Sequence, residues 1–167
     1  MRSVIVALGI NDHHRISKAR NMVYGNPSEP YLSLAVFDDT EASKIEAGCE
    51  ILAAKLARTT ISVSGLGIFQ GDAPVIFASV TLTENLRVLH TSVHKTFPQL
   101  LSRPYYQPGA WDPHITLAMC DTISAAESKL SSLLPFSLRG TYTGSELLLV
   151  SAPPVCIEKR FDLRDRT

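Results

Sequence analysis

The sequence has few cysteines and no excess of either charge. The three cysteines, Cys49, Cys120 and Cys156, lie far apart without CxxC spacing. An odd number of scattered cysteines is typical of reduced thiols, so we expect a cytoplasmic protein in which each is a small buried residue. The 16 basic residues equal the 16 acidic ones, which argues against binding of long nucleic acids through a positive field.

Long hydrophobic runs are also missing. The apolar run at residues 3–10 is too short to span a membrane and lacks a small-residue cleavage site, so we interpret it as a buried strand and expect no membrane association. A hydrophobic content of 45% and a charged content of 19% are typical of a soluble globular domain. The length of 167 residues suits one domain with a proper core, and we expect a monomer.

Hydrophobic periodicity predicts alternating strands and helices. We expect strands at residues 3–10, 31–37, 59–69, 75–82, 114–119, 135–143, 145–152 and 155–163. Four helices are expected between them, one capped by Asp12, one after residue 38, one from about Glu84 and one opened by a Ser124–Glu127 capping box. Residues 98–113, with four of the ten prolines, are predicted to form a long loop.

The two halves of the chain resemble each other in element order. The stretch PYLSLAVFDDT can be aligned with PHITLAMCDT, which places Tyr31 on His114 and Ser33 on Thr116. Any two buried strands share Leu and Ala, but the matched proline and hydroxyl positions favour an internal duplication. We therefore predict an α+β fold of two pseudo-symmetric lobes, approximately 1–72 and 73–167, with antiparallel-dominated sheets around a central groove.

His114 and Thr116 are the most informative pair of residues. They are two positions apart in a predicted strand, so their side chains share a face. Histidine can accept or donate a proton at neutral pH, and a nearby hydroxyl can donate hydrogen bonds to the oxygens of a phosphate. This chemistry cleaves a phosphodiester and requires no metal or cofactor. The alternative is a buried, hydrogen-bonded histidine without chemistry.

The motif His114-Ile-Thr116-Leu, with its duplicated partner, resembles the 2H phosphoesterase superfamily, which includes bacterial 2′-5′ RNA ligases and 2′,3′-cyclic nucleotide phosphodiesterases. The resemblance implies two facing lobes, each supplying a histidine for acid–base chemistry and a hydroxyl for binding phosphate. His114 matches the second histidine, and Thr116 and Ser33 match the phosphate-binding hydroxyls. The first histidine is replaced by Tyr31, which is a poor base at neutral pH but can donate a hydrogen bond or act as a weak acid.

Three functions are compatible with this replacement. The protein could be a slow or altered phosphoesterase that hydrolyses a 2′,3′-cyclic nucleotide or RNA-end phosphate with His114. It could bind a nucleotide or phosphometabolite without catalysis. It could also recruit another group opposite His114. For that last role we weighed His13, His14 and the His90–His94 pair, and interpret them as solvated or half-buried helix positions.

The loop before His114 carries four further candidates for substrate binding. Aromatic side chains near a phosphate site can stack on a base, and an arginine can pair with the phosphate. An equally weighted alternative is that these aromatics only fold the loop onto the sheet. The four residues are Arg103, Tyr105, Tyr106 and Trp111.

Overall fold

The computed structural model describes residues 1–9, 14–24, 29–38, 41–153 and 155–165. In chain order its elements are β1 (Arg2–Leu8), α1 (His14–Tyr24), β2 (Tyr31–Phe37), α2 (Ala42–Ala53), β3 (Thr59–Phe69), β4 (Val75–Val80), α3 (Glu84–Thr96), the 3-10 helix η1 (Pro104–Tyr106), β5 (His114–Met119), α4 (Ile123–Leu133), β6 (Gly140–Ser151) and β7 (Cys156–Asp162). None of the described helices is both long and apolar enough to cross a membrane.

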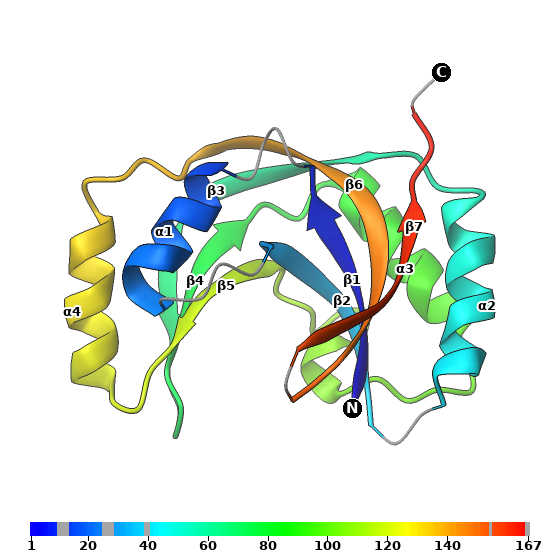
Figure 1. The fold of residues 1–167 in the computed structure, drawn as a ribbon, viewed down its shortest axis with the longest axis horizontal. Helices are drawn as coiled ribbons and strands as arrows, with labels where there is room; N and C mark the ends of the chain where they lie inside the picture. Colours follow the sequence, from blue (N-terminus) through cyan, green and yellow to red (C-terminus); the bar gives the residue numbers. More distant parts are fainter. Residues whose placement is uncertain (10–13, 25–28, 39–40, 154, 166–167) are drawn as a thin grey trace.

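The strands form one antiparallel sheet in the order β2-β1-β6-β3-β4-β5, with β7 paired to β6. This confirms the predicted α+β class. Strand β6 joins the two ends of the sheet, because its first half pairs with β3 and its second half pairs with β1 and β7. Figure 1 shows β6 arching over the molecule between these two groups of strands.

Strand β6 also corrects a prediction. Residues 135–143 and 145–152 were expected to be separate strands, but residues 140–151 form one. Gly144, between the two expected strands, is a point of close approach, since a Cβ atom there would lie 2.9 Å from Val6 Cγ2 and 3.0 Å from Thr59 Cγ2. The absence of a side chain lets β1 and β3 meet against the same strand.

All four α-helices contribute to a single large core on one face of the sheet. Helices α1 and α4 pack against β3, β4 and β5, and lie on the opposite side of the molecule from α2, which packs against β6 and β7 (Figure 1). Helix α1 precedes β2 in the chain but contacts β5, so elements from both halves of the sequence meet at one end of the sheet. The lobe boundaries at residue 72 and the duplication itself stay predictions.

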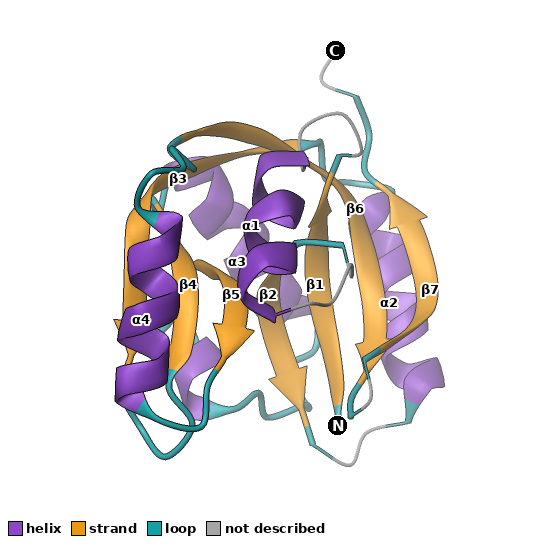
Figure 2. Cartoon of the chain, turned by 60° about the vertical axis from the view of Figure 1, so that its left-hand side comes forward, coloured by secondary structure: helices purple, strands orange, loops and turns teal. Residues whose placement is uncertain are grey.

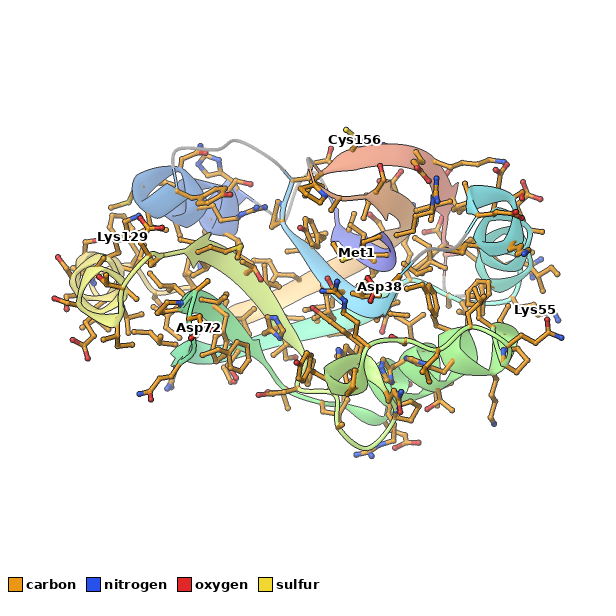
Figure 3. The ribbon with its side chains drawn as sticks, turned by 90° about the horizontal axis from the view of Figure 1, so that it is seen from below. Met1, Asp38, Lys55, Asp72, Lys129 and Cys156 are labelled. Atoms are coloured by element: carbon orange, nitrogen blue, oxygen red, sulfur yellow. The ribbon has the colours of Figure 1, made fainter. Side chains whose placement is uncertain are left out.

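Two local predictions were wrong. Helix α4 is capped by Thr122, whose hydroxyl accepts a hydrogen bond from the Ala125 amide at 3.2 Å, and Ser124 lies inside the first turn because the helix begins at Ile123, two residues earlier than a Ser124 cap predicts. Cys156 is exposed at the start of β7 (Figure 3), whereas Cys49 and Cys120 are buried as expected. The predicted cap Asp12 lies outside the described residues.

Candidate functional site

The register of the sheet places Tyr31, Ser33, His114 and Thr116 on the face opposite the main core. Tyr31 pairs with Ala7 and Ser33 with Ile5 at one end of the sheet, while His114 pairs with Ser79 and Thr116 with Phe77 at the other. The four side chains are partly exposed, whereas the alternate residues Leu32, Leu34, Ile115 and Leu117 are buried in the core. We call the face that carries these four residues the motif face.

Strands β2 and β5 are at opposite ends of the sheet order but lie next to each other in space (Figure 2). The curvature of the sheet brings its two edges together. A direct bond joins them, because Trp111 Nε1, three residues before β5, donates to the Ser33 carbonyl at 3.0 Å. The two strands that carry the motif residues are therefore neighbours.

His114 is held in one tautomer by the chain that precedes it. Its Nδ1 lies 2.8 Å from the Asp112 carbonyl oxygen. Because a carbonyl only accepts hydrogen bonds, Nδ1 carries the proton and Nε2 is left as a proton acceptor. The short link between residues 112 and 114 thus orients the imidazole as a base.

Two phenylalanines surround the His114 ring on the motif face. The His114 ring lies edge-on to Phe69 at 4.8 Å and to Phe77 at 5.6 Å, and these two rings stack on each other at 3.9 Å. Gly67 permits this stack, because a Cβ atom there would lie 2.5 Å from Phe77 Cζ. His114 therefore lies beside partly exposed aromatic rings on β3 and β4.

Tyr31 lies beside a buried cation. Arg20 on α1 is 5% exposed, and its guanidinium carbon lies 5.8 Å from the centre of the Tyr31 ring. Burial raises the pKa of Tyr31 above its ordinary value, and the Arg20 charge opposes that rise. Tyr31 is consequently a protonated phenol at neutral pH, with a positive charge nearby that would stabilise its anion.

Ser33 is fixed by groups from η1, α3 and the loop. Its side chain is hydrogen-bonded to that of Tyr106. The Tyr106 carbonyl accepts a hydrogen bond from His90 Nε2 at 2.8 Å, and the His90 ring stacks on Trp111 at 4.0 Å and 3°. Tyr106 and Trp111 therefore reach the motif, but Trp111 does so as a largely buried residue that binds the backbone.

His90 corrects the expectation of a half-buried helix face, because it is 3% exposed. Burial lowers the pKa of His90 to about 4 and also lowers that of His94. His94 Nε2 lies 3.3 Å from the Leu34 carbonyl and 3.2 Å from His90 Nε2. Since the Tyr106 carbonyl only accepts, His90 Nε2 donates to it, and the contacts of the two rings link α3 to η1 and β2.

Arg103 and Tyr105 lie elsewhere. The Arg103 guanidinium binds both carboxylate oxygens of Asp38, at 2.8 and 3.1 Å, and this pair lies just beyond the last residue of β2, whereas Tyr31 is its first. Figure 3 shows Asp38 close to Met1. Tyr105 is 73% exposed, and its phenol interacts with the Arg103 charge. The structure does not bring these two residues to the motif.

The other histidines and acidic residues do not form a metal site in the part of the chain that the structure describes. There, no group of three or more His, Cys, Asp or Glu side chains could hold a metal ion. His14 is exposed at the start of α1, and His13 lies outside the described residues.

Sequence reasoning missed Arg20, Phe69 and Phe77. Arg20 interrupts an otherwise apolar stripe, four residues after Ile16 and three before Val23, and a charge at such a position was a usable signal. Phe69 and Phe77 lie in predicted strands, but their meeting beside His114 depends on the register of β3, β4 and β5.

Comparison with models of protein families identifies the family of this chain. Residues 11–152 match the model of the 2′-5′ RNA ligase superfamily. The chain belongs to this superfamily of 2H phosphoesterases. No curated protein matches the chain.

Several solved structures share this fold. TT0787 of Thermus thermophilus has a TM-score of 0.68 and 18% identity, with 99% of each chain covered. E. coli LigT in complex with 3′-AMP has a TM-score of 0.63 and 15% identity, with 97% of each chain covered. Usb1 of Kluyveromyces marxianus has a TM-score of 0.54 and 16% identity, again with 97% of each chain covered. Other LigT structures contain NADP+, ATP or phosphate.

Proposed function

We propose that this superfamily member is a degenerate 2H phosphoesterase that hydrolyses a 2′,3′-cyclic nucleotide or the cyclic phosphate at an RNA end. The observation that carries the proposal is the orientation of His114. With Nδ1 bonded to the Asp112 carbonyl, Nε2 is available to take a proton from the attacking water. The histidine is thus prepared for the role of base.

The hydroxyls of Thr116 and Ser33 bind the phosphate in this scheme. Thr116 shares the motif face with His114, and Ser33 is oriented from the β2 side by Tyr106. Hydroxyl donors placed this way stabilise the charge that develops on the non-bridging oxygens as water attacks. The reaction assigned to these residues is therefore a displacement at phosphorus, with His114 on the side of the attacking water.

Phe69 and Phe77 provide the aromatic surface for a base in this proposal. Their rings are partly exposed and lie against His114, whereas Trp111, the aromatic expected from the sequence, is buried against His90. Stacking of one base on an aromatic side chain is worth roughly 1–3 kcal/mol. We therefore place the base of the nucleotide on the β3–β4 side of His114.

The second candidate is a protein that binds nucleotides or phosphometabolites without cleaving them. Tyr31 favours it, since loss of one of two acid–base groups removes roughly 10²–10⁴-fold in rate. The binding of 3′-AMP, ATP and NADP+ in crystals of LigT makes the same ligand classes reasonable for this chain.

The test uses the full chain with 2′,3′-cyclic AMP, and the product is separated by chromatography. His114→Ala is expected to lower kcat by at least about 100-fold, as for removal of a general base. His14→Ala is the matched control, because His14 is exposed on α1, and it should retain activity. Thermal stabilisation by 2′,3′-cyclic AMP without turnover would favour the binding protein. If the wild type shows no turnover and no stabilisation by 2′,3′-cyclic AMP, both candidates are refuted.

A further inference from the structure

Helix α1 buries a charged residue in its apolar face. Ile16, Ala19 and Val23 form the buried stripe of this helix, and Arg20 lies among them at 5% exposure. Removing a guanidinium from water is costly, and arginine is almost never fully buried without compensating contacts. An aliphatic residue would pack there at lower cost, so the charge itself needs an explanation.

The Arg20 guanidinium is fixed relative to Tyr31. Its Nη1 donates to the Glu29 carbonyl at 2.8 Å, two residues before Tyr31, and its carbon lies 5.8 Å from the Tyr31 ring centre. One arginine thus contacts both the backbone that leads into β2 and the first side chain of that strand.

The titratable and charged groups near Tyr31 come from several elements. Tyr24 on α1 and Tyr106 on η1 interact with it electrostatically. Tyr31 pairs with Ala7 on β1, and Ala7 pairs on its other side with Glu146 on β6. The carboxylates of Glu146 and Glu29 both bind Arg160, at 2.9 and 3.0 Å. The nearby acidic side chains are therefore balanced by an arginine other than Arg20.

We propose that Tyr31 is the catalytic general acid of the motif face and that Arg20 is its positioning residue, supplying the positive charge that a second histidine would carry. The inference rests on the proposed hydrolase function. Water attacks phosphorus while His114 Nε2 takes its proton. The bond from phosphorus to the ribose oxygen breaks, and Tyr31 Oη gives its proton to that oxygen. The phenolate that forms is stabilised by Arg20, and proton return from His114 through water restores both groups.

The dependence on the leaving group tests the acid. A ribose oxygen is a poor leaving group and needs a proton, whereas 4-nitrophenolate leaves without one. Tyr31→Phe should lower kcat by about 10²–10⁴-fold on 2′,3′-cyclic AMP, the usual contribution of a general acid. It should change kcat by less than about threefold on the 4-nitrophenyl ester of a nucleoside 3′-phosphate, where no proton is needed.

The Arg20 variants test the positioning residue. Arg20→Gln should lower kcat on 2′,3′-cyclic AMP by at least about tenfold, and Arg20→Lys should recover part of it because it keeps the charge. Arg20→Gln should also move the basic limb of the kcat/KM profile to higher pH, because loss of the cation raises the pKa of Tyr31. A merely structural role would not move that limb. Arg15→Gln, at an exposed site on the same helix, is the matched control.

Each outcome decides one claim. If His114→Ala abolishes hydrolysis, the hydrolase function stands. If Tyr31→Phe then slows hydrolysis of both substrates equally, or of neither substrate, the role of Tyr31 as general acid is refuted. If Arg20→Gln folds, as judged by circular dichroism, and leaves both rate and pH profile unchanged, Arg20 has no such role. Should Arg20→Gln fail to fold, Arg20→Lys and the shift of the Tyr31 ¹³Cζ NMR titration in that variant decide the question. Absence of turnover in the wild type refutes the hydrolase and the acid together.

Discussion

The two motif strands carry their motif residues at the same positions, the first and the third, but in different chemical surroundings. On β5, His114 is pinned by the Asp112 carbonyl and lies edge-on to Phe69 and Phe77. On β2, Tyr31 lies against the buried cation Arg20. A cation beside an imidazole disfavours its protonated form, but a cation beside a phenol favours its anion. The surroundings of β2 therefore match the tyrosine found there better than the histidine it replaces.

This difference indicates that the chemistry of residue 31 depends on the charge of Arg20. A histidine introduced next to an unchanged Arg20 would be held neutral, and a neutral imidazole cannot donate the proton that a leaving oxygen needs. The replacement of one residue in the motif is thus linked to a residue on a helix that the motif does not include.

The largest expected effect comes from restoring the histidine. Tyr31→His alone should lower kcat on 2′,3′-cyclic AMP by about 10²–10⁴-fold, since it removes the acid and puts a neutral imidazole in its place. Tyr31→His combined with Arg20→Gln should recover at least about tenfold of that loss, because the imidazole can then be protonated. Steady-state rates of the two variants measure this. An active single variant would show that Arg20 does not control the chemistry of residue 31.

An intermediate effect is expected from pH, through the groups that hold Ser33. The pKa of His90 in the folded chain is about 4, below its ordinary 6.5. The unfolded chain therefore binds a proton that the folded chain does not, and the free energy of unfolding falls as pH drops from about 6.5 to about 4. The loss should be on the order of 1–3 kcal/mol.

Urea unfolding at pH 7.5 and pH 5 measures this loss. His90→Gln can still donate to the Tyr106 carbonyl but does not titrate, so its unfolding free energy should depend less on pH. His94, whose pKa is also lowered by burial, still contributes to the pH dependence of the unfolding free energy in this variant. His14→Gln, at an exposed position, should behave like the wild type. If the unfolding free energy of His90→Gln depended on pH as strongly as that of the wild type, protonation of His90 would not be the cause of the loss.

The smallest expected effect is at the far end of β2. Arg103 was predicted to bind phosphate, but it binds Asp38 on the surface. Arg103→Ala should leave the KM for 2′,3′-cyclic AMP within about a factor of two, because exposed ion pairs contribute little and this one is distant from Tyr31. Kinetics of the variant at low salt are the check. A clear rise in KM would restore the original prediction.

Much of the fold followed from periodicity in the sequence. Alternation and apolar stripes located β1 to β5 and all four helices, because these patterns reflect which side chains face the single core. The single strand β6 was expected to be two strands, because a glycine such as Gly144 looks the same in a turn and at a close contact between strands. Only the positions of β1 and β3 distinguish the two cases.

The candidate site was predicted less completely. The motif residues could be named from their two-residue spacing, because alternation in a strand is local. Arg20, Phe69 and Phe77 could not be placed, since their meeting with Tyr31 and His114 depends on helix packing and on strand register. For Trp111 the sequence left base stacking and folding of the loop onto the sheet equally open, and its indole donates to the Ser33 carbonyl. A contact to a backbone atom leaves no pattern in the sequence.

The outer edge of β2 is covered by residues 98–113 and α3 rather than by a strand. Val36 bonds to Ser102 and Arg103, Ser33 to Trp111, and Leu34 to His94. Unsatisfied strand edges recruit other chains, so we expect the segment that holds Ser33 in place also to limit self-association. Proteolytic cleavage within residues 98–113 should therefore produce oligomers at the same time as it weakens ligand binding, because the same segment covers the edge of β2 and contacts Ser33.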